Sequence, residues 1–360
     1  MTLPIKKWCF SILRPVLTVI VALLIGSLLV LPTGTSPLEA YRALFIGAFG
    51  SPTAILNTLM RATPLLFCGL SACIALKSGV FNIGLEGQLY LGGITSALVA
   101  CWLDFLPGFL LIPVAFLAAG AAGVLWSVIP AFLKEKLGVN LVITSIMMNN
   151  IAVLFTTYLS TYVFKGDLPI SATPKIPEHA MLPKFSIRSD FNIGFFLAVL
   201  IAVLLFVLIY KTSFGYECRA LGLNANFTNY IGVDVSRRAL AVMFISAFIA
   251  GLGGAEQSLG VNNMFISNFS PGYGFTGITV VLLGGMHPFG VIVGAIFFGA
   301  LTSGAIQMEV MTSVSRDLIN TIQAVIILLL AADGLFRFGM RRRKRAGKKS
   351  SDTGKEAAEA

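Results

Sequence analysis

The chain has 360 residues, of which 56% are hydrophobic and only 12% are charged, and its mean hydropathy is +0.87. Soluble domains carry about a quarter charged residues, so this chain has too few charges to cover the surface of a soluble enzyme of its size. Several apolar stretches approach the roughly 20 residues that cross a bilayer. The composition therefore predicts an all-α polytopic membrane protein.

Apolar runs separated by polar residues predict about ten transmembrane helices. The expected spans lie near residues 15–31, 54–76, 83–103, 108–131, 141–164, 193–210, 239–259, 276–286, 289–308 and 318–336. The total is ten if the Gly-rich pair 276–286 and 289–308 counts as two crossings. A count of eight crossings is also even, so it would likewise place both termini on the same side of the membrane.

The distribution of Lys and Arg predicts the orientation. With the N-terminus inside, the internal segments hold 19 of these residues and the external segments hold six. Positive residues are retained on the cytoplasmic side, so both termini are expected in the cytoplasm, with the chain in a bacterial cytoplasmic membrane. Residues 1–336 form the expected transmembrane domain, and residues 337–360 form a basic, disordered tail. Because this tail directly follows an apolar span, no nucleic-acid partner is expected.

Two polar connections differ in character. Residues 165–190 contain four prolines, which predicts an external loop without a long helix. Residues 211–238 form a longer internal segment with helical patches separated by glycines. This second connection predicts a short amphipathic helix on the cytoplasmic side, available to a partner.

Charges are scarce inside the expected spans, where each costs about 2.5–3.5 kcal/mol on insertion scales. Glu86 lies in the sequence FNIGLEGQ at residues 81–88, with two glycines and the amides Asn82 and Gln88. One interpretation is a broken helix beside a permeation path. The alternative is a helix-packing seam in which Glu86 pairs with Arg61. Asn149, in the span near 141–164, is a further buried polar candidate.

A second Gly-rich stretch, residues 251–257, resembles the first in composition and includes Glu256. Two such stretches in the two halves suggest an inverted internal repeat with a binding site between the halves. The two histidines, His179 and His287, are too far apart in sequence to indicate a metal site. No cofactor is expected either. The chain lacks a G-x-x-x-x-G-K-[ST] motif, so it is not expected to hydrolyse nucleotide itself.

Four stretches together resemble the permease subunits of bacterial ATP-binding-cassette (ABC) importers for nucleosides and simple sugars. They read GVFNIGLEGQ (79–88), GVNLVITSIMMNNIA (138–152), TSFG with RALG and NYIGV (within 212–233), and GYGFTGI with LGG (within 272–285). The form of residues 81–88 is closer to the nucleoside branch, of purine type, than to the ribose branch. One departure is MMNN at 147–150, where relatives more often read Met-Leu-Asn-Tyr.

The resemblance implies a permease that is not itself an enzyme. Its expected partners are cytoplasmic ATP-binding subunits, a second permease subunit forming a homo- or heterodimer, and an external substrate-binding lipoprotein. It also implies a coupling helix within residues 215–232. We therefore assign two sets of residues. The expected contacts with the ATPase are Glu217, Arg219 and Asn224, and the expected lining of the translocation path is Asn82, Glu86, Gln88 and Asn149.

Two other functions compete with this interpretation. A secondary transporter could use Glu86 or Glu256 for proton coupling, and loss of uptake with the proton gradient would reveal it. A membrane-embedded enzyme would need a catalytic constellation, and the scattered carboxylates and isolated histidines offer none.

Overall fold

The computed structural model describes residues 19–312, 314–326 and 328–329. The chain divides into two compact units, residues 1–40 with 312–360, and residues 41–311. In its described part, the first unit contains the helical segment Val19–Thr33 and the helix Asp317–Ile326. The expected tail at 337–360 lies outside the described residues, as do parts of the first and last expected spans.

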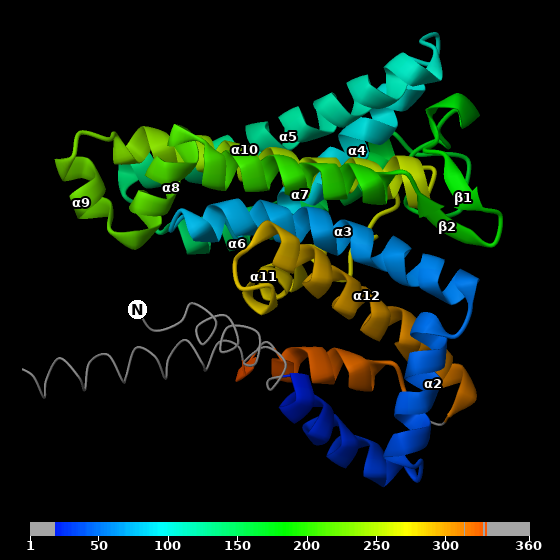
Figure 1. Cartoon of the computed structure of the whole chain (residues 1–360). Helices are drawn as coiled ribbons and strands as arrows, with labels where there is room; N and C mark the ends of the chain where they lie inside the picture. The colour runs from blue at the N-terminus through cyan, green and yellow to red at the C-terminus, as the bar shows by residue number, and fades with distance from the viewer. Residues whose placement is uncertain (1–18, 313, 327, 330–360) are drawn as a thin grey trace, which may run out of the picture. The chain divides into compact units, whose positions relative to one another are not determined.

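The second unit is almost entirely helical (Figure 1), as the sequence predicts. Helix α2 (Pro37–Phe49) leads into it. The remaining helices are α3 (Pro52–Lys77), α4 (Leu85–Trp102), α5 (Gly108–Leu137), α6 (Leu141–Tyr158), α7 (Gly194–Lys211), α8 (Ser213–Leu223), α9 (Ala225–Tyr230), α10 (Val235–Glu256), α11 (Tyr273–Leu283) and α12 (Pro288–Met311). Short π-helical turns extend α6 through Leu159–Val163 and α10 through Gln257–Val261.

Local sequence explains where several helices begin. Ser51 caps α3 by accepting from the Ala54 amide, and Pro52 occupies the first turn, where its missing amide hydrogen costs nothing. Thr212, Asn224 and Asp234 cap α8, α9 and α10 in the same way. The connection at 211–238 therefore folds as two short helices and the start of α10.

The connection between α6 and α7 carries a small antiparallel hairpin. Strand β1 (Lys184–Ser186) pairs with β2 (Ser189–Asn192), and the register places Lys184 opposite Asn192. Ala172 forms an isolated bridge with Ile266. In the described residues this connection contains no long helix, as its prolines predict.

Six described helices are long and apolar enough to cross a membrane, or seven if the bent pair Val19–Thr33 and Pro37–Phe49 is one span. They are α3, α5, α6 with its extension, α7, α10 with its extension, and α12. Ten crossings are therefore not reached by the described helices. One reason is α11, whose eleven residues cover only about 16 Å at 1.5 Å per residue.

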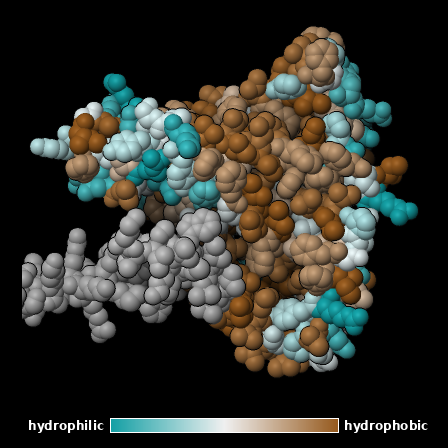
Figure 2. Space-filling view, viewed as in Figure 1, coloured by the Kyte–Doolittle hydropathy of each residue, from teal (hydrophilic) through white to brown (hydrophobic). Residues whose placement is uncertain are grey.

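The helices sort into a central and a peripheral set. The most apolar windows of α3 and α10 are 78% and 67% buried, whereas those of α5, α6 and α7 are 33–39% buried. Helix α10 packs against α3, α4 and α5, and α12 and α11 pack against α3. Figure 2 shows a broad apolar surface across the middle of the helices that face the viewer, with hydrophilic residues at the α8–α9 end and at the hairpin end. Such a band is what a bilayer covers.

Close contact between α4 and α10 depends on glycine. A Cβ on Gly254 would overlap the carbonyl oxygen of Leu89, and a Cβ on Gly92 would overlap the backbone of Gly251. Small residues let backbones approach and gain dispersion contacts where apolar burial alone does not drive association in lipid.

We predict that Gly254→Ala destabilises the protein by about 1–3 kcal/mol, because α4 and α10 must separate to admit the methyl group. The measurement is thermal unfolding in detergent, followed with a thiol-reactive dye that reports exposure of the buried Cys68 and Cys73. Ala121→Val, on the exposed face of α5, is the control and should leave the transition unchanged. Equal transitions for both variants would contradict the close-packing argument.

Candidate functional site

The chain leaves helical geometry between α3 and α4, at residues 78–84. Asn82 holds this break together. Its Oδ1 accepts from the Gly84 amide at 3.0 Å and from Gln88 Nε2 at 3.2 Å, while its Nδ2 donates to Gln88 Oε1 at 3.1 Å and to Ser246 Oγ at 2.9 Å. The two carboxamides thus form a reciprocal pair that links the break to α4 and to α10. Both side chains are buried.

Asn149 clamps the same break from α6. Its Oδ1 accepts from the Gly87 amide at 2.9 Å, and its Nδ2 donates to the Ile83 carbonyl at 2.8 Å. The neighbouring Trp126 indole donates to the Met148 carbonyl at 3.2 Å. Asn149 is therefore bonded on both sides of the α4 N-terminus and satisfies backbone groups that the helix leaves open.

Glu86 points away from this amide cluster, towards α11. Its Oε2 accepts from the Gly274 amide at 2.6 Å, and both residues lie in the first turn of their helices. A helix N-terminus carries a partial positive charge, so two N-termini favour a carboxylate between them. A Cβ on Gly274 would lie 2.6 Å from the Glu86 amide nitrogen, which explains the glycine.

Arg61 does not pair with Glu86 in the described part of the chain, so the expected alternative of an Arg61–Glu86 ion pair is wrong. Arg61 Nε is instead buried without a hydrogen-bond partner among the described residues. Glu256, the second intramembrane carboxylate, is fully buried. It accepts from Asn192 Nδ2 at 2.9 Å and from Gln257 Nε2 at 2.7 Å. Glu86 and Glu256 thus accept hydrogen bonds from different donors, a backbone amide of α11 for Glu86 and two side-chain amides for Glu256.

The residues expected to contact an ATPase lie at the opposite end of the unit from the hairpin, and two of them face inward. Glu217 pairs with Arg238 of α10, and Arg219 donates to the Ile209 carbonyl at the end of α7. Asn224 caps α9 by accepting from the Phe227 amide at 3.1 Å. These contacts fix the position of α8 and α9.

Sequence reasoning missed an aromatic junction beside α8. The Tyr210 ring lies 5.4 Å from the Arg219 guanidinium carbon and 5.6 Å from Lys77 Nζ. The His287 ring centroid lies 5.3 Å from that of Tyr210. Burial and the nearby Lys77 lower the pKa of His287, so its ring is neutral at pH 7 and can stack without adding a third charge. The junction joins α3, α7, α8 and the α11–α12 connection.

Sequence reasoning also missed a group of exposed apolar residues on α8 and α9. Leu223, at the end of α8, and Phe227 and Tyr230, on α9, are 88%, 58% and 89% exposed. Phe227 and Tyr230 are three residues apart and share one face of α9, and apolar residues within a polar connection were the available signal. Exposed apolar residues grouped in this way mark an interaction surface.

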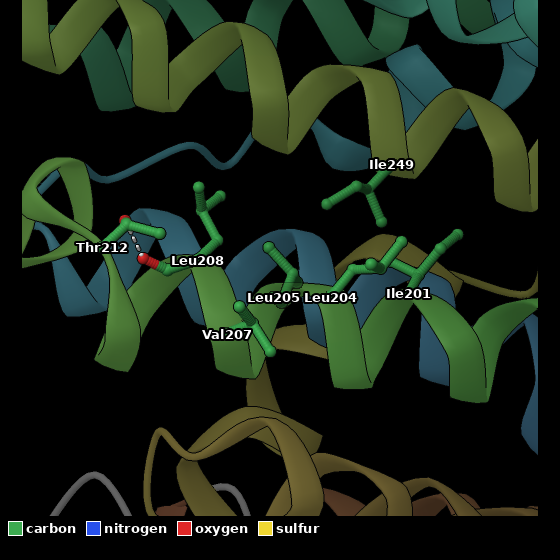
Figure 3. A pocket seen from close by; sticks show the side chains of 7 residues that line it. All are labelled: Ile201, Leu204, Leu205, Val207, Leu208, Thr212 and Ile249. Atoms are coloured by element: carbon green, nitrogen blue, oxygen red, sulfur yellow. Dashed lines mark hydrogen bonds between the residues drawn. The ribbon is translucent and has the colours of Figure 1, made fainter.

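A cavity of about 360 Å³ lies between α7 and α10 (Figure 3). Its lining is aliphatic except for Thr212, whose hydroxyl already donates to the Leu208 carbonyl at 2.6 Å. Such a lining offers no polar group to a hydrophilic solute. Nor do three or more His, Cys, Asp or Glu side chains gather as a metal site anywhere in the described part of the chain.

Comparison with known families gives a match over residues 54–331, to the family described as the permease component of branched-chain amino acid transport systems. The chain belongs to this permease family. The match runs from the first turn of α3 to beyond the end of α12 and includes the break at 78–84.

Individual relatives extend over nearly the whole permease. The guanosine ABC transporter permease NupP of Bacillus subtilis is 35% identical, covering 93% of this chain and 97% of its own. The glucose ABC transporter permease TsgB13 of Haloferax volcanii is 34% identical over 90% and 88%, and the nucleoside ABC transporter permease NupB of Lactococcus lactis is 31% identical over 89% and 91%.

A second permease of each of these organisms also matches, at lower identity. NupQ of Bacillus subtilis is 28% identical over 67% of this chain and 78% of its own, NupC of Lactococcus lactis 24% over 70% and 81%, and TsgC13 of Haloferax volcanii 26% over 68% and 74%.

We predict that Glu86→Ala lowers the thermal stability of the permease more than Glu86→Gln. Alanine leaves the Gly274 amide without an acceptor, which costs about 1–3 kcal/mol, whereas glutamine retains an acceptor and loses only the charge. The measurement is the apparent Tm in detergent. Uptake of the transported solute by cells that carry the variant is a second readout. Glu135→Ala, at an exposed position of α5, is the control. A Glu86→Ala protein with unchanged Tm and uptake would refute a role for this contact.

Proposed function

We propose that this permease is the membrane-spanning subunit of an ATP-driven importer of nucleosides, of purine type, in the cytoplasmic membrane. The observation that carries the proposal is the match to the guanosine permease NupP over 97% of that relative's length. NupB, named for nucleosides, matches over a similar extent, and TsgB13, named for glucose, keeps sugars as the second candidate class. A proton-coupled mechanism gains no support from these relatives.

The two broken elements border the translocation path in this proposal. The four residues assigned to the path are between 1% and 6% exposed in this conformation: Asn82, Glu86, Gln88 and Asn149. They therefore support the backbone that borders the path and do not themselves form its surface. Nucleosides are neutral and polar, and amide groups can replace their water hydrogen bonds without a charged anchor. The solute-binding energy would reside mainly in the external lipoprotein, with a weak and transient site in the permease.

The breaks before α4 and α11 also support the inverted repeat. In each case a non-helical stretch, at 78–84 and at 262–272, leads into a helix, and the two first turns meet where buried Glu86 accepts from the buried Gly274 amide. With each stretch and its helix counted as one crossing, the expected total of ten remains our proposal. The orientation with both termini in the cytoplasm follows from the Lys and Arg distribution.

The α8–α9 surface is the proposed seat of the ATP-binding subunits. The exposed Leu223, Phe227 and Tyr230 would enter a groove of the ATPase, with Asn224 at their edge. Glu217 and Arg219 would transmit the movement, because they tie α8 to α10 and α7. ATP binding would close the ATPase pair and rock the two permease subunits between inward-open and outward-open states. The second permease completes the path, and the external lipoprotein delivers the solute near the hairpin.

The test of this function is uptake by the complete complex in proteoliposomes. Guanosine uptake should require ATP on the side of the ATPase, persist with a protonophore and be reduced by other purine nucleosides more than by glucose. An importer driven by a proton gradient would instead lose uptake when the protonophore is added. Stronger competition by glucose would move the substrate class to sugars.

We predict that Arg219→Glu reduces the stimulation of the partner ATPase by about tenfold or more, while membrane insertion remains normal. The substitution replaces a charged donor to the Ile209 carbonyl by a carboxylate that repels it. Hydrogen bonds to charged groups are worth about 1.5–3 kcal/mol. The measurement is the ATPase rate of the reconstituted complex with and without loaded binding protein. Arg237→Glu is the matched control, because the Arg237 side chain is 87% exposed. Equal stimulation in the two variants would count against the role of Arg219.

A further inference from the structure

Helix α6 presents a continuous exposed stripe along its outer face. Its members follow one another at spacings of four, three, four and four residues: Ile143, Met147, Asn150, Leu154 and Tyr158. At 100° per residue, these positions form one narrow strip along the helix. We call this strip the α6 stripe. The opposite face of α6 holds Asn149 against α4.

Asn150 places a carboxamide near the centre of the membrane. The candidate span runs over Leu141–Val163, so Asn150 is its tenth residue of 23. The side-chain Nδ2 donates to the Ile146 carbonyl of the same helix at 3.3 Å. A carboxamide has two donors and two acceptor lone pairs, so most of its capacity is left for a neighbour. In hydrocarbon a polar side chain of this kind is placed against protein or a water-filled space.

The outer faces of α5 and α7 differ from the α6 stripe and serve as internal references. Exposed positions in the membrane part of α5 include Phe109, Leu117 and Leu125, and those of α7 include Leu200 and Val207. Between residues 109 and 132 of α5, and between residues 194 and 209 of α7, every exposed side chain is apolar. These faces suit lipid. Of the three peripheral helices, α6 is the one whose mid-membrane outer face carries a polar side chain.

We propose that the α6 stripe is the surface on which a second, homologous but non-identical permease chain packs, with Asn150 hydrogen-bonded across the contact. Asn side chains form such bonds between transmembrane helices. This proposal rests on the proposed function and names its partner. The occupant follows from the relatives, because in three organisms this chain matches one permease at 31–35% identity and a second one at 24–28%. The chain therefore corresponds to one member of a pair of unequal permeases, and the other member is the occupant.

The test is site-specific photo-cross-linking in the native membrane, with benzoylphenylalanine introduced in turn at positions 147 and 154 of the full chain, so that Asn150 is kept. On a denaturing gel, we expect the band of this chain to shift by the mass of one permease. Mass spectrometry should identify the added protein as a homologous permease. The matched control is the same photoreactive residue at position 200, on the apolar face of α7, where no such shift is expected.

A second measurement addresses the carboxamide itself. Asn150→Leu should reduce the amount of partner permease that co-purifies in detergent, whereas Asn150→Gln should restore it. Cross-linking to a second copy of this chain, or cross-linking at position 200 as efficient as at position 154, would overturn the proposal. So would the absence of a protein adduct at both positions of the stripe. Failure of the proposed function is distinct, because uptake that needs no ATP would not alter the cross-linking pattern.

Discussion

Two helices of this permease, α4 and α11, begin directly after non-helical stretches within the apolar part of the chain, and side chains from other elements accept from their first amides. The first amides of a helix lack partners within that helix, and an unsatisfied group in a bilayer costs several kcal/mol. The chain resolves this with short polar side chains. Asn82 and Asn149 serve the start of α4, and Ser270 and Glu86 serve the start of α11, through the Tyr273 and Gly274 amides. The positions of both breaks depend on these few side chains.

This requirement explains which parts of the site the sequence predicts and which it cannot. The concentration of Asn, Glu, Gln and Gly at 81–88 is costly in lipid, so a break and a buried role follow from composition alone. The partner of Glu86 does not follow, because Gly274 is 188 residues away and contributes only a backbone amide. The identity of residue 274 does not reveal that its backbone amide donates to Glu86. Arg61 seemed the natural partner because charge is visible in sequence, whereas a helix terminus is not.

The span count shows the same limit. Apolar length predicts the six long helices well, since each contains an 18-residue window of high mean hydropathy. It also predicts a span near 276–286, where the structure has non-helical backbone followed by a helix of eleven residues. Hydropathy records how apolar a segment is and not how its amides are satisfied. At the α8–α9 end, the charges of Glu217 and Arg219 within a polar connection favoured the prediction that they contact a partner. Their inward orientation depends on Arg238 and on the Ile209 carbonyl, which the local sequence does not indicate.

The junction at Tyr210 brings α8 together with residues that flank both broken elements. Lys77 is the last residue of α3 and directly precedes the first break, while His287 follows α11 and precedes α12. Both lie against the ring that Arg219 of α8 also contacts. In addition, Gly222 of α8 approaches the Lys77 carbonyl and the Gly79 amide so closely that a Cβ would overlap them. Helix α8 thus touches the end of α3 directly and reaches the α11–α12 connection through the Tyr210 ring. Packed contacts of this kind transmit displacement because they repack between discrete arrangements. A displacement of α8 would therefore reach Lys77, which precedes the first break, and His287, which follows α11.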